Sequence, residues 1–197
     1  MTRSWAGTTL TARRDERRDR LMDVAFDLLG TQGSAAVTVR SVCRHARLTD
    51  RYFYESFTDR DELLLAVYDA VATEAHTVLV DAIGRADHPD RVARVAVEAF
   101  VALLADDPRK GRVLLIEPLT EPRLGARGAE SMPAFAELIR SQLGPKASRL
   151  QARLTSTALI GALTNLFIRW LDGGLRVSRK QLTDYCVRML QTAHDAL

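Results

Sequence analysis

Cysteine is scarce in this chain: Cys43 and Cys186 are the only two among 197 residues, and they lie far apart in the sequence. Two such cysteines exclude a disulfide framework and a zinc knuckle, so we expect both to be reduced and structural. A signal-peptide pattern is also missing, because residues 13–20 are almost wholly charged. Both absences favour a cytoplasmic protein without a metal site.

Residue patterns typical of enzymes are missing too. The four histidines, at positions 45, 76, 88 and 194, are scattered, and no glycine-rich phosphate loop, carboxylate pair or metal-ligand spacing accompanies them. Glu74 and His76 are the nearest approach to a catalytic site, and two residues alone do not support one. We therefore expect no enzyme, no catalytic residue, no cofactor and no metal.

Long charge-free runs are also absent. The longest, residues 154–168, lies between Arg153 and Arg169 and is shorter than the roughly 20 residues of a membrane span. We interpret it as part of a buried helix. The apolar fraction of 47% and the six prolines are typical of an ordinary folded, soluble protein without a membrane partner.

Positive charge is concentrated at the N-terminal end. Residues 1–60 contain 11 Arg and no Lys against 8 acidic residues, whereas residues 61–197 contain 17 basic and 17 acidic residues. The net charge of +3 therefore comes entirely from the first part of the chain. A nucleic-acid-binding surface predicts this distribution, and an uneven but inert surface is the alternative.

Helical periodicity dominates the N-terminal part of the sequence. In residues 13–31 the apolar side chains recur at three- and four-residue intervals, which predicts a helix with one apolar face. Thr38 and Thr49 are suited to cap two further short helices. In the second of these, Phe53 and Phe57 lie four residues apart and are expected to pack on the first helix. Three such helices form a helix-turn-helix head.

About six more helices are expected downstream, which makes the protein all-α with about nine helices. They cover residues 61–84, 92–104, a short segment near 113–116, 134–143, 147–171 and 178–193, and the prolines and glycines in residues 118–128 predict an irregular stretch. We expect three regions: a disordered arm at residues 1–12, a helix-turn-helix domain at 13–60, and a second helical domain at 61–197.

Four short motifs in residues 18–65 resemble the tetracycline-repressor (TetR) family of bacterial regulators. They are AFDLL at 25–29, TVR at 38–40, LTDRYFYESF at 48–57 and DRDELL at 59–64, in the order and spacing of the family. The resemblance implies a DNA-binding transcriptional regulator, and repression is the usual mode in the family. Two departures are Arg47, where the family usually has Gly, and Arg60, where Lys is usual.

The second of the two short helices is expected to enter the major groove while neighbouring groups bind phosphate. By resemblance, Thr49 and Tyr54 bind phosphate and Arg40 reaches DNA; Arg51 and Tyr52 are our candidates for base contact. The full set of predicted DNA-binding residues is Thr38, Arg40, Thr49, Asp50, Arg51, Tyr52, Tyr54 and Arg60. Alternatively, one of the two tyrosines packs in the core of the head. For the arginines at 13, 14, 17 and 18, contact with DNA and a merely solvated face remain open.

Dimerisation follows from the requirement for specificity. One short helix cannot select an operator in a genome, whereas two heads one helical turn apart on a palindrome can. The resemblance places the homodimer interface on the last two helices, and the alternative is that their apolar residues form the core of one chain. The predicted interface residues are Leu159, Leu163, Leu166, Trp170, Leu182, Val187 and Leu190.

A small-molecule inducer is also implied by the resemblance. It would enter between the long helices of a ligand-binding and dimerisation domain, change the separation of the two heads and lower the affinity for DNA. The predicted pocket residues are Tyr68, His76, Phe100, Glu117, Asn165, Phe167 and Trp170. Their apolar majority favours a hydrophobic ligand with one or two polar groups. The alternative is a DNA-binding dimer without such a ligand, controlled by a protein partner or bound constitutively.

Overall fold

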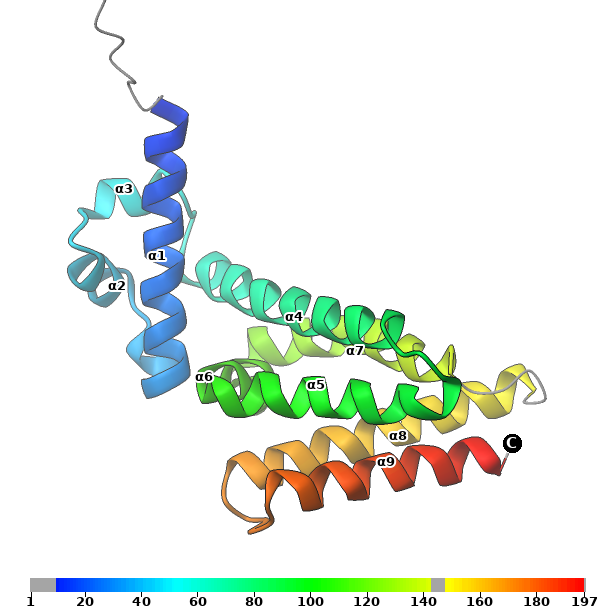
Figure 1. Ribbon diagram of the computed structural model, residues 1–197. Helices are drawn as coiled ribbons and strands as arrows, with labels where there is room; N and C mark the ends of the chain where they lie inside the picture. Colours follow the sequence, from blue (N-terminus) through cyan, green and yellow to red (C-terminus); the bar gives the residue numbers. More distant parts are fainter. Residues whose placement is uncertain (1–9, 143–147, 197) are drawn as a thin grey trace, which may run out of the picture. The chain divides into compact units, whose positions relative to one another are not determined.

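The computed structural model describes residues 10–142 and 148–196, and within these ranges the protein is helical and contains no strand, as predicted (Figure 1). The predicted arm lies mostly outside the described residues, but residues 10–12, which we had assigned to it, are already helical. The α-helices of the described chain are α1 (Leu10–Gln32), α2 (Val39–Ala46), α3 (Asp50–Tyr54), α4 (Arg60–Gly84), α5 (Val92–Asp106), α6 (Pro108–Gly111), α7 (Pro122–Arg140), α8 (Arg149–Leu171) and α9 (Arg179–Asp195).

The chain divides into two compact units, one ending at Val67 and the other beginning at Tyr68. Helix α4 therefore contributes its first residues to the N-terminal unit and the remainder to the second. The sequence had placed the boundary at residue 60, at the start of this helix.

The N-terminal unit is a three-helix head with an apolar centre. Helix α1 packs against α2 and α3, and Phe53 and Phe57 are both buried, as predicted. Burial of each phenylalanine contributes about 1.5–3 kcal/mol to the stability of the head. The other large buried side chains of this core are Leu21, Leu28, Leu29, Val37, Val42, Leu63, Leu64 and Val67.

The second unit is built from longer helices. Helices α5, α8 and α9 share an apolar core, and α7 packs along α8 (Figure 1). The core residues are Val97, Val101, Leu104, Leu163, Phe167, Leu182, Cys186 and Val187. Each helix contributes one apolar face to this core, which explains why the periodicity of the sequence predicted these helices well.

Helix α7 begins earlier than predicted, at Pro122. Residues 122–128, which we expected to be irregular, are therefore helical. Gly125 and Gly128 do not interrupt the helix. A Cβ at Gly125 would lie 2.8 Å from the carbonyl oxygen of Pro118, and one at Gly128 would lie 3.2 Å from the hydroxyl of Tyr68. Both glycines therefore allow neighbouring groups to pack closely against α7. A local sequence pattern cannot distinguish a glycine with this role from one that ends a helix.

The segment between α6 and α7 is irregular as far as residue 121. A single π-helical turn, Arg112–Ile116, is followed by the short 3-10 helix Glu117–Leu119. Nε of Arg112 donates to Oε1 of Glu117 at 2.8 Å, so the buried carboxylate is paired with a charge. This pair fixes the compact turn that leads into α7.

Helices α4 and α8 are long and apolar enough to cross a membrane by length and composition alone. This is weak evidence, since core helices of soluble proteins meet the same criterion. Only 22% of the most apolar part of α8 is buried within one chain. The interpretation of residues 154–168 as a buried helix is therefore right for one face of α8 only.

Candidate nucleic-acid interface and ligand cavity

Helix α2 begins with a reciprocal cap. The amide of Ser41 donates to Oγ1 of Thr38 at 3.1 Å, and the amide of Thr38 donates to Oγ of Ser41 at 3.0 Å. The predicted N-cap at Thr38 is therefore confirmed, and its hydroxyl contributes to holding the N-terminus of α2. Arg40, the second residue of this helix, is exposed.

The turn between α2 and α3 requires a left-handed residue, and that residue is Arg47, with φ 54° and ψ 43°. The amide of Leu48 donates to the carbonyl of Cys43 at 2.9 Å across this turn, which closes the end of α2. Arg47 thus accepts the turn geometry that glycine usually provides, at a cost of about 1–2 kcal/mol.

Helix α3 presents a polar and aromatic face to solvent. Thr49 and Asp50 are exposed at its start, and the side chain of Arg51 is 84% exposed. Tyr52 and Tyr54 are 36% and 59% exposed. Neither tyrosine is buried. The alternative prediction, that one of them packs in the core of the head, is therefore wrong.

Asp50 also links α3 to α2 through Cys43. The two side chains are hydrogen-bonded, and since an ionised carboxylate can only accept, the thiol donates. Burial, and then Asp50, raise the pKa of the Cys43 thiol to about 11. Cys43 is therefore a neutral, structural thiol at physiological pH, as expected from the sequence.

Three arginines of α1 hold the end of α3. Arg14 donates to the carbonyl of Glu55, and Nη1 of Arg18 donates to the carbonyl of Ser56 at 3.1 Å. Arg17 forms an ion pair with Glu55 at 3.5 Å, and its guanidinium lies over the ring of Tyr52. These contacts orient α3, a role of the arginines that the sequence did not reveal. The only available indication was the position of these arginines at three- and four-residue intervals on one helix.

Arg60 lies at the start of α4 and contacts the backbone of the segment before α2. Its Nε donates to the carbonyl of Val37 at 2.7 Å and its Nη2 to the carbonyl of Ser34 at 2.8 Å. The guanidinium also pairs with Asp61. The sequence predicted a contact with DNA for Arg60; within the head its guanidinium instead holds the segment before α2.

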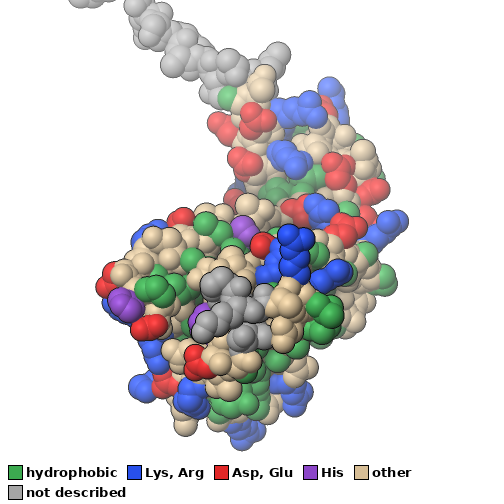
Figure 2. All heavy atoms as spheres, turned by 90° about the vertical axis from the view of Figure 1, so that its right-hand side faces the viewer, with side chains coloured by type: hydrophobic (Ala, Val, Ile, Leu, Met, Phe, Trp, Pro, Cys, Tyr) green, Lys and Arg blue, Asp and Glu red, His purple; other side chains and the backbone are tan. Residues whose placement is uncertain are grey.

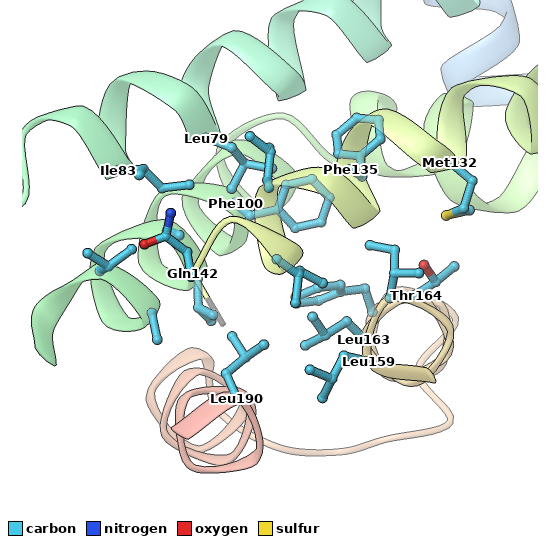
Figure 3. A pocket seen from close by; sticks show the side chains of 18 of the residues that line it. Leu79, Ile83, Phe100, Met132, Phe135, Gln142, Leu159, Leu163, Thr164 and Leu190 are labelled. Carbon is cyan, nitrogen blue, oxygen red and sulfur yellow. The ribbon is translucent and has the colours of Figure 1, made fainter. Parts of the chain in front are cut away.

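A cavity of about 510 Å³ lies within the second unit, between α4, α5, α7, α8 and α9 (Figure 3). Its wall is mostly apolar, and Phe100, Leu163 and Leu190 point into it from three helices (Figure 3). Of the predicted pocket residues, Tyr68, Phe100 and Phe167 line the cavity. Met132 and Phe135, which the sequence analysis did not select, line it from α7.

The other four predicted pocket residues lie elsewhere. His76 is not among the lining residues and contacts Phe135 edge to face, with ring centroids 5.8 Å apart. Glu117 is bound to Arg112, Asn165 is exposed, and Nε1 of Trp170 donates to the carbonyl of Val177 at 3.3 Å. Their contacts could not be read from the sequence, because each depends on the direction of a helix face.

Few polar groups reach the cavity wall. Tyr68 is buried, and this burial raises the pKa of its phenol, which is hydrogen-bonded to Ser131. At the other end of the helices, Asp90, His194 and Asp195 are exposed, and this end of the domain displays acidic, basic and histidine side chains among apolar ones (Figure 2). Within the described ranges, no group of three His, Cys, Asp or Glu side chains is placed to hold a metal ion.

The predicted interface residues mostly belong to the core of one chain. Leu159, Leu163, Leu182 and Val187 are buried there, and the remaining three, Leu166, Trp170 and Leu190, pack against that core as partly buried residues. The exposed apolar side chains of α8 and α9 are instead Leu150, Leu154 and Tyr185.

An all-α chain with a capped helix-turn-helix head followed by a helical domain is the architecture of a helix-turn-helix transcriptional regulator. A family model described as "Bacterial regulatory proteins, tetR family" matches residues 21–67, which span most of the head. The head of this chain therefore matches the DNA-binding region of this family, as the motifs of the sequence predicted.

Solved structures share this fold over most of the chain. The fatty acid degradation regulator FadR from Bacillus halodurans is 15% identical, with 88% of this chain and 94% of that chain covered and a TM-score of 0.74. FadR from Bacillus subtilis in complex with stearoyl-CoA is 15% identical, with 87% and 96% covered and a TM-score of 0.73. A TetR-like regulator from Rhodococcus sp. RHA1 is 18% identical, with 92% and 97% covered and a TM-score of 0.68. At these identities the likeness shows the fold alone.

Proposed function

We propose that the protein is a dimeric repressor that binds a palindromic operator and is released when an apolar small molecule occupies the cavity in its second unit. The cavity of about 510 Å³ carries this proposal. Its volume falls within the usual range of ligand pockets, and an apolar wall with few polar groups is typical of them. A regulator without a ligand has no need of such a cavity, which would cost it stability.

The exposed face of α3 provides the base contacts in this proposal. Arg51 and Tyr52 read base edges, Thr49 and Tyr54 bind phosphate, and Arg40 reaches a guanine from α2. Exposure of all five side chains supports this assignment. The remaining candidates support this surface: Thr38 caps α2, Asp50 links α3 to α2, and Arg60 anchors the segment before α2.

The homodimer forms through the outer faces of α8 and α9. Leu150 and Leu154 are 67% and 62% exposed on α8, and Tyr185 is exposed on α9. Leucines left in water at successive turns of a helix favour association, because their burial against a second copy contributes about 25 cal/mol per Å². The buried leucines of the same helices maintain the shape of each subunit.

The ligand in this proposal is hydrophobic. FadR from Bacillus subtilis, which has the same fold, is seen with stearoyl-CoA. A domain of this architecture can therefore accommodate a molecule with a long apolar chain, and Leu79, Phe100, Met132 and Leu163 line an apolar space here.

Nile red, an uncharged apolar dye, tests ligand control directly. We expect its fluorescence to rise on binding, and the fluorescence anisotropy of labelled operator DNA bound to the protein to fall as dye is added. Ala96→Phe places a ring on the cavity wall and should weaken both effects. Ala70→Phe makes the same change at an exposed position of α4 and serves as the control. Dye binding that leaves the operator complex intact would favour the alternative regulator without an inducer.

A further inference from the structure

The charges at the cavity constrain the ligand. Among the described residues that line it there is no Lys or Arg, and the only ionisable side chains besides Tyr68 are Asp90, His194 and Asp195. Nδ1 of His194 is hydrogen-bonded to the carbonyl of Gln142, at 3.0 Å. An anionic group of a ligand at this end would therefore lie beside the carboxylates of Asp90 and Asp195. An anionic group placed deeper in the cavity would lose its hydration without gaining a cationic partner among the described lining residues.

The polar group at the other end of the cavity has a defined hydrogen-bonding capacity. Oγ of Ser131 donates its one proton to the carbonyl of Arg127 at 2.9 Å. Ser131 lies beside the phenol of Tyr68 and lowers its pKa, against the larger effect of burial. The phenolic oxygen of Tyr68 keeps lone pairs that can accept a proton from a ligand.

The surroundings of Tyr68 are rigid. Arg127, one turn before Ser131, is held by two hydrogen bonds to Asp69, at 2.7 and 2.8 Å. Gly128 leaves room for the phenol, because a Cβ there would lie 3.2 Å from the hydroxyl oxygen. This acceptor is therefore fixed in place on the wall before any ligand binds.

The two ends of the cavity are well separated. Ser131 lies within α7 and Gln142 lies two residues beyond its end, and the helical part of this segment alone, nine residues from Ser131 to Arg140, spans about 14 Å. Between them the wall is formed by apolar side chains such as Phe135 and Leu138. A ligand that spans this distance is elongated and apolar along its length.

Building on the proposed ligand control, we infer that the ligand is an elongated, uncharged molecule with a hydroxyl group at its deeply bound end. The hydroxyl forms a hydrogen bond with the phenol of Tyr68, and the apolar chain extends towards Gln142. A fatty acid or an acyl-CoA does not suit this cavity, although a protein of the same fold is seen with stearoyl-CoA. Tyr68 is then the residue that determines specificity.

Titration calorimetry with matched ten-carbon probes tests this inference. We expect 1-decanol to bind at least tenfold more tightly than decanoate or decanoyl-CoA at pH 8, where the carboxylate is ionised. Tyr68→Phe should weaken decanol binding about three- to tenfold, the usual effect of one hydrogen bond, and leave the binding of 1-decene unchanged. Because Tyr68 is buried, Gly128→Ala provides a second variant: its Cβ would lie 3.2 Å from the phenolic hydroxyl and should weaken decanol binding more than decene binding.

Two other outcomes are distinguishable. If decanoate binds more tightly than decanol and releases the operator, the inferred ligand class is wrong while ligand control stands. The same holds if Tyr68→Phe weakens decanol and decene equally. If neither Nile red nor any of the ten-carbon probes binds the folded protein, ligand control and the inferred ligand class both fail.

Discussion

The guanidinium of Arg17 lies over the ring of Tyr52, with Cζ 4.5 Å from the ring centroid. One residue belongs to the long first helix and the other to the helix that we assign to the major groove. This contact stabilises the orientation of an exposed tyrosine before DNA is bound, and similar cation–π contacts are worth about 0.5–1 kcal/mol.

Arg17→Ala should therefore weaken operator binding about three- to fivefold, because Tyr52 loses the group that fixes its ring and Glu55 loses an ion pair. Stability should change by less than about 1 kcal/mol, since both partners are partly exposed. Fluorescence anisotropy with operator DNA measures the first effect and urea unfolding the second. Arg20→Ala, at an exposed position of the same helix, is the control. Equal effects of the two substitutions would mean that net charge, and not the contact with Tyr52, is responsible.

Arg47→Gly should stabilise the head by up to about 1 kcal/mol. Glycine adopts the left-handed conformation of this turn without the steric cost that arginine incurs, although it also gains entropy in the unfolded chain. Urea unfolding followed by circular dichroism provides the measurement. Arg47→Ala removes the same side chain but retains a Cβ, so it should bring no gain; a gain in the alanine variant would assign the cost to charge and not to backbone conformation.

Leu154→Glu should convert the dimer to a monomer and lower operator affinity, because it places a charge on the apolar outer face of α8. Size-exclusion chromatography with light scattering gives the mass directly. Leu119→Glu makes the same change at an equally exposed leucine outside α8 and α9 and should leave the mass unchanged. A dimeric Leu154→Glu variant would place the interface elsewhere.

Stability should decline between about pH 9 and pH 11. Burial raises the pKa of the Cys186 thiol from 9.0 to about 11, so the folded protein retains a proton that the unfolded chain has already lost. The contribution of the protonated Cys186 thiol to the free energy of unfolding is complete below pH 9. It is lost as the pH rises towards the pKa of about 11 in the folded protein. Cys186→Ala should show a shallower decline in urea unfolding free energy over this range. An unchanged slope would contradict the assignment to Cys186.

The head was largely predictable because its determinants are local. Thr38 caps the helix that follows it, and the spacing of Phe53 and Phe57 places both on one face. The arginine contacts to α3 were not predictable, because they join α1 to carbonyls some forty residues later. A local pattern cannot show which cations of a helix meet such a partner.

The second unit shows where local reasoning fails. Gly125 and Gly128 were interpreted as helix breaks, whereas Pro118 and Tyr68 occupy the space beside them. Similarly, Phe167 lines the cavity while Trp170, one turn later, does not. Whether an apolar residue becomes cavity wall, core or outer face depends on how the helices are rotated, and that rotation is set by packing across the whole unit.

The most direct test of the proposed DNA-binding surface is a salt titration of binding to DNA flanking the protein's own gene, with wild type and Arg51→Ala compared. We expect tight binding that falls steeply with salt, and a loss of about 1–3 kcal/mol in the variant, since Arg51 is exposed on α3 and assigned to a base edge. Arg85→Ala, an equally exposed arginine in the second unit, should bind as wild type does. A folded Arg51→Ala variant that binds this DNA as tightly as wild type at every salt concentration would contradict the assignment.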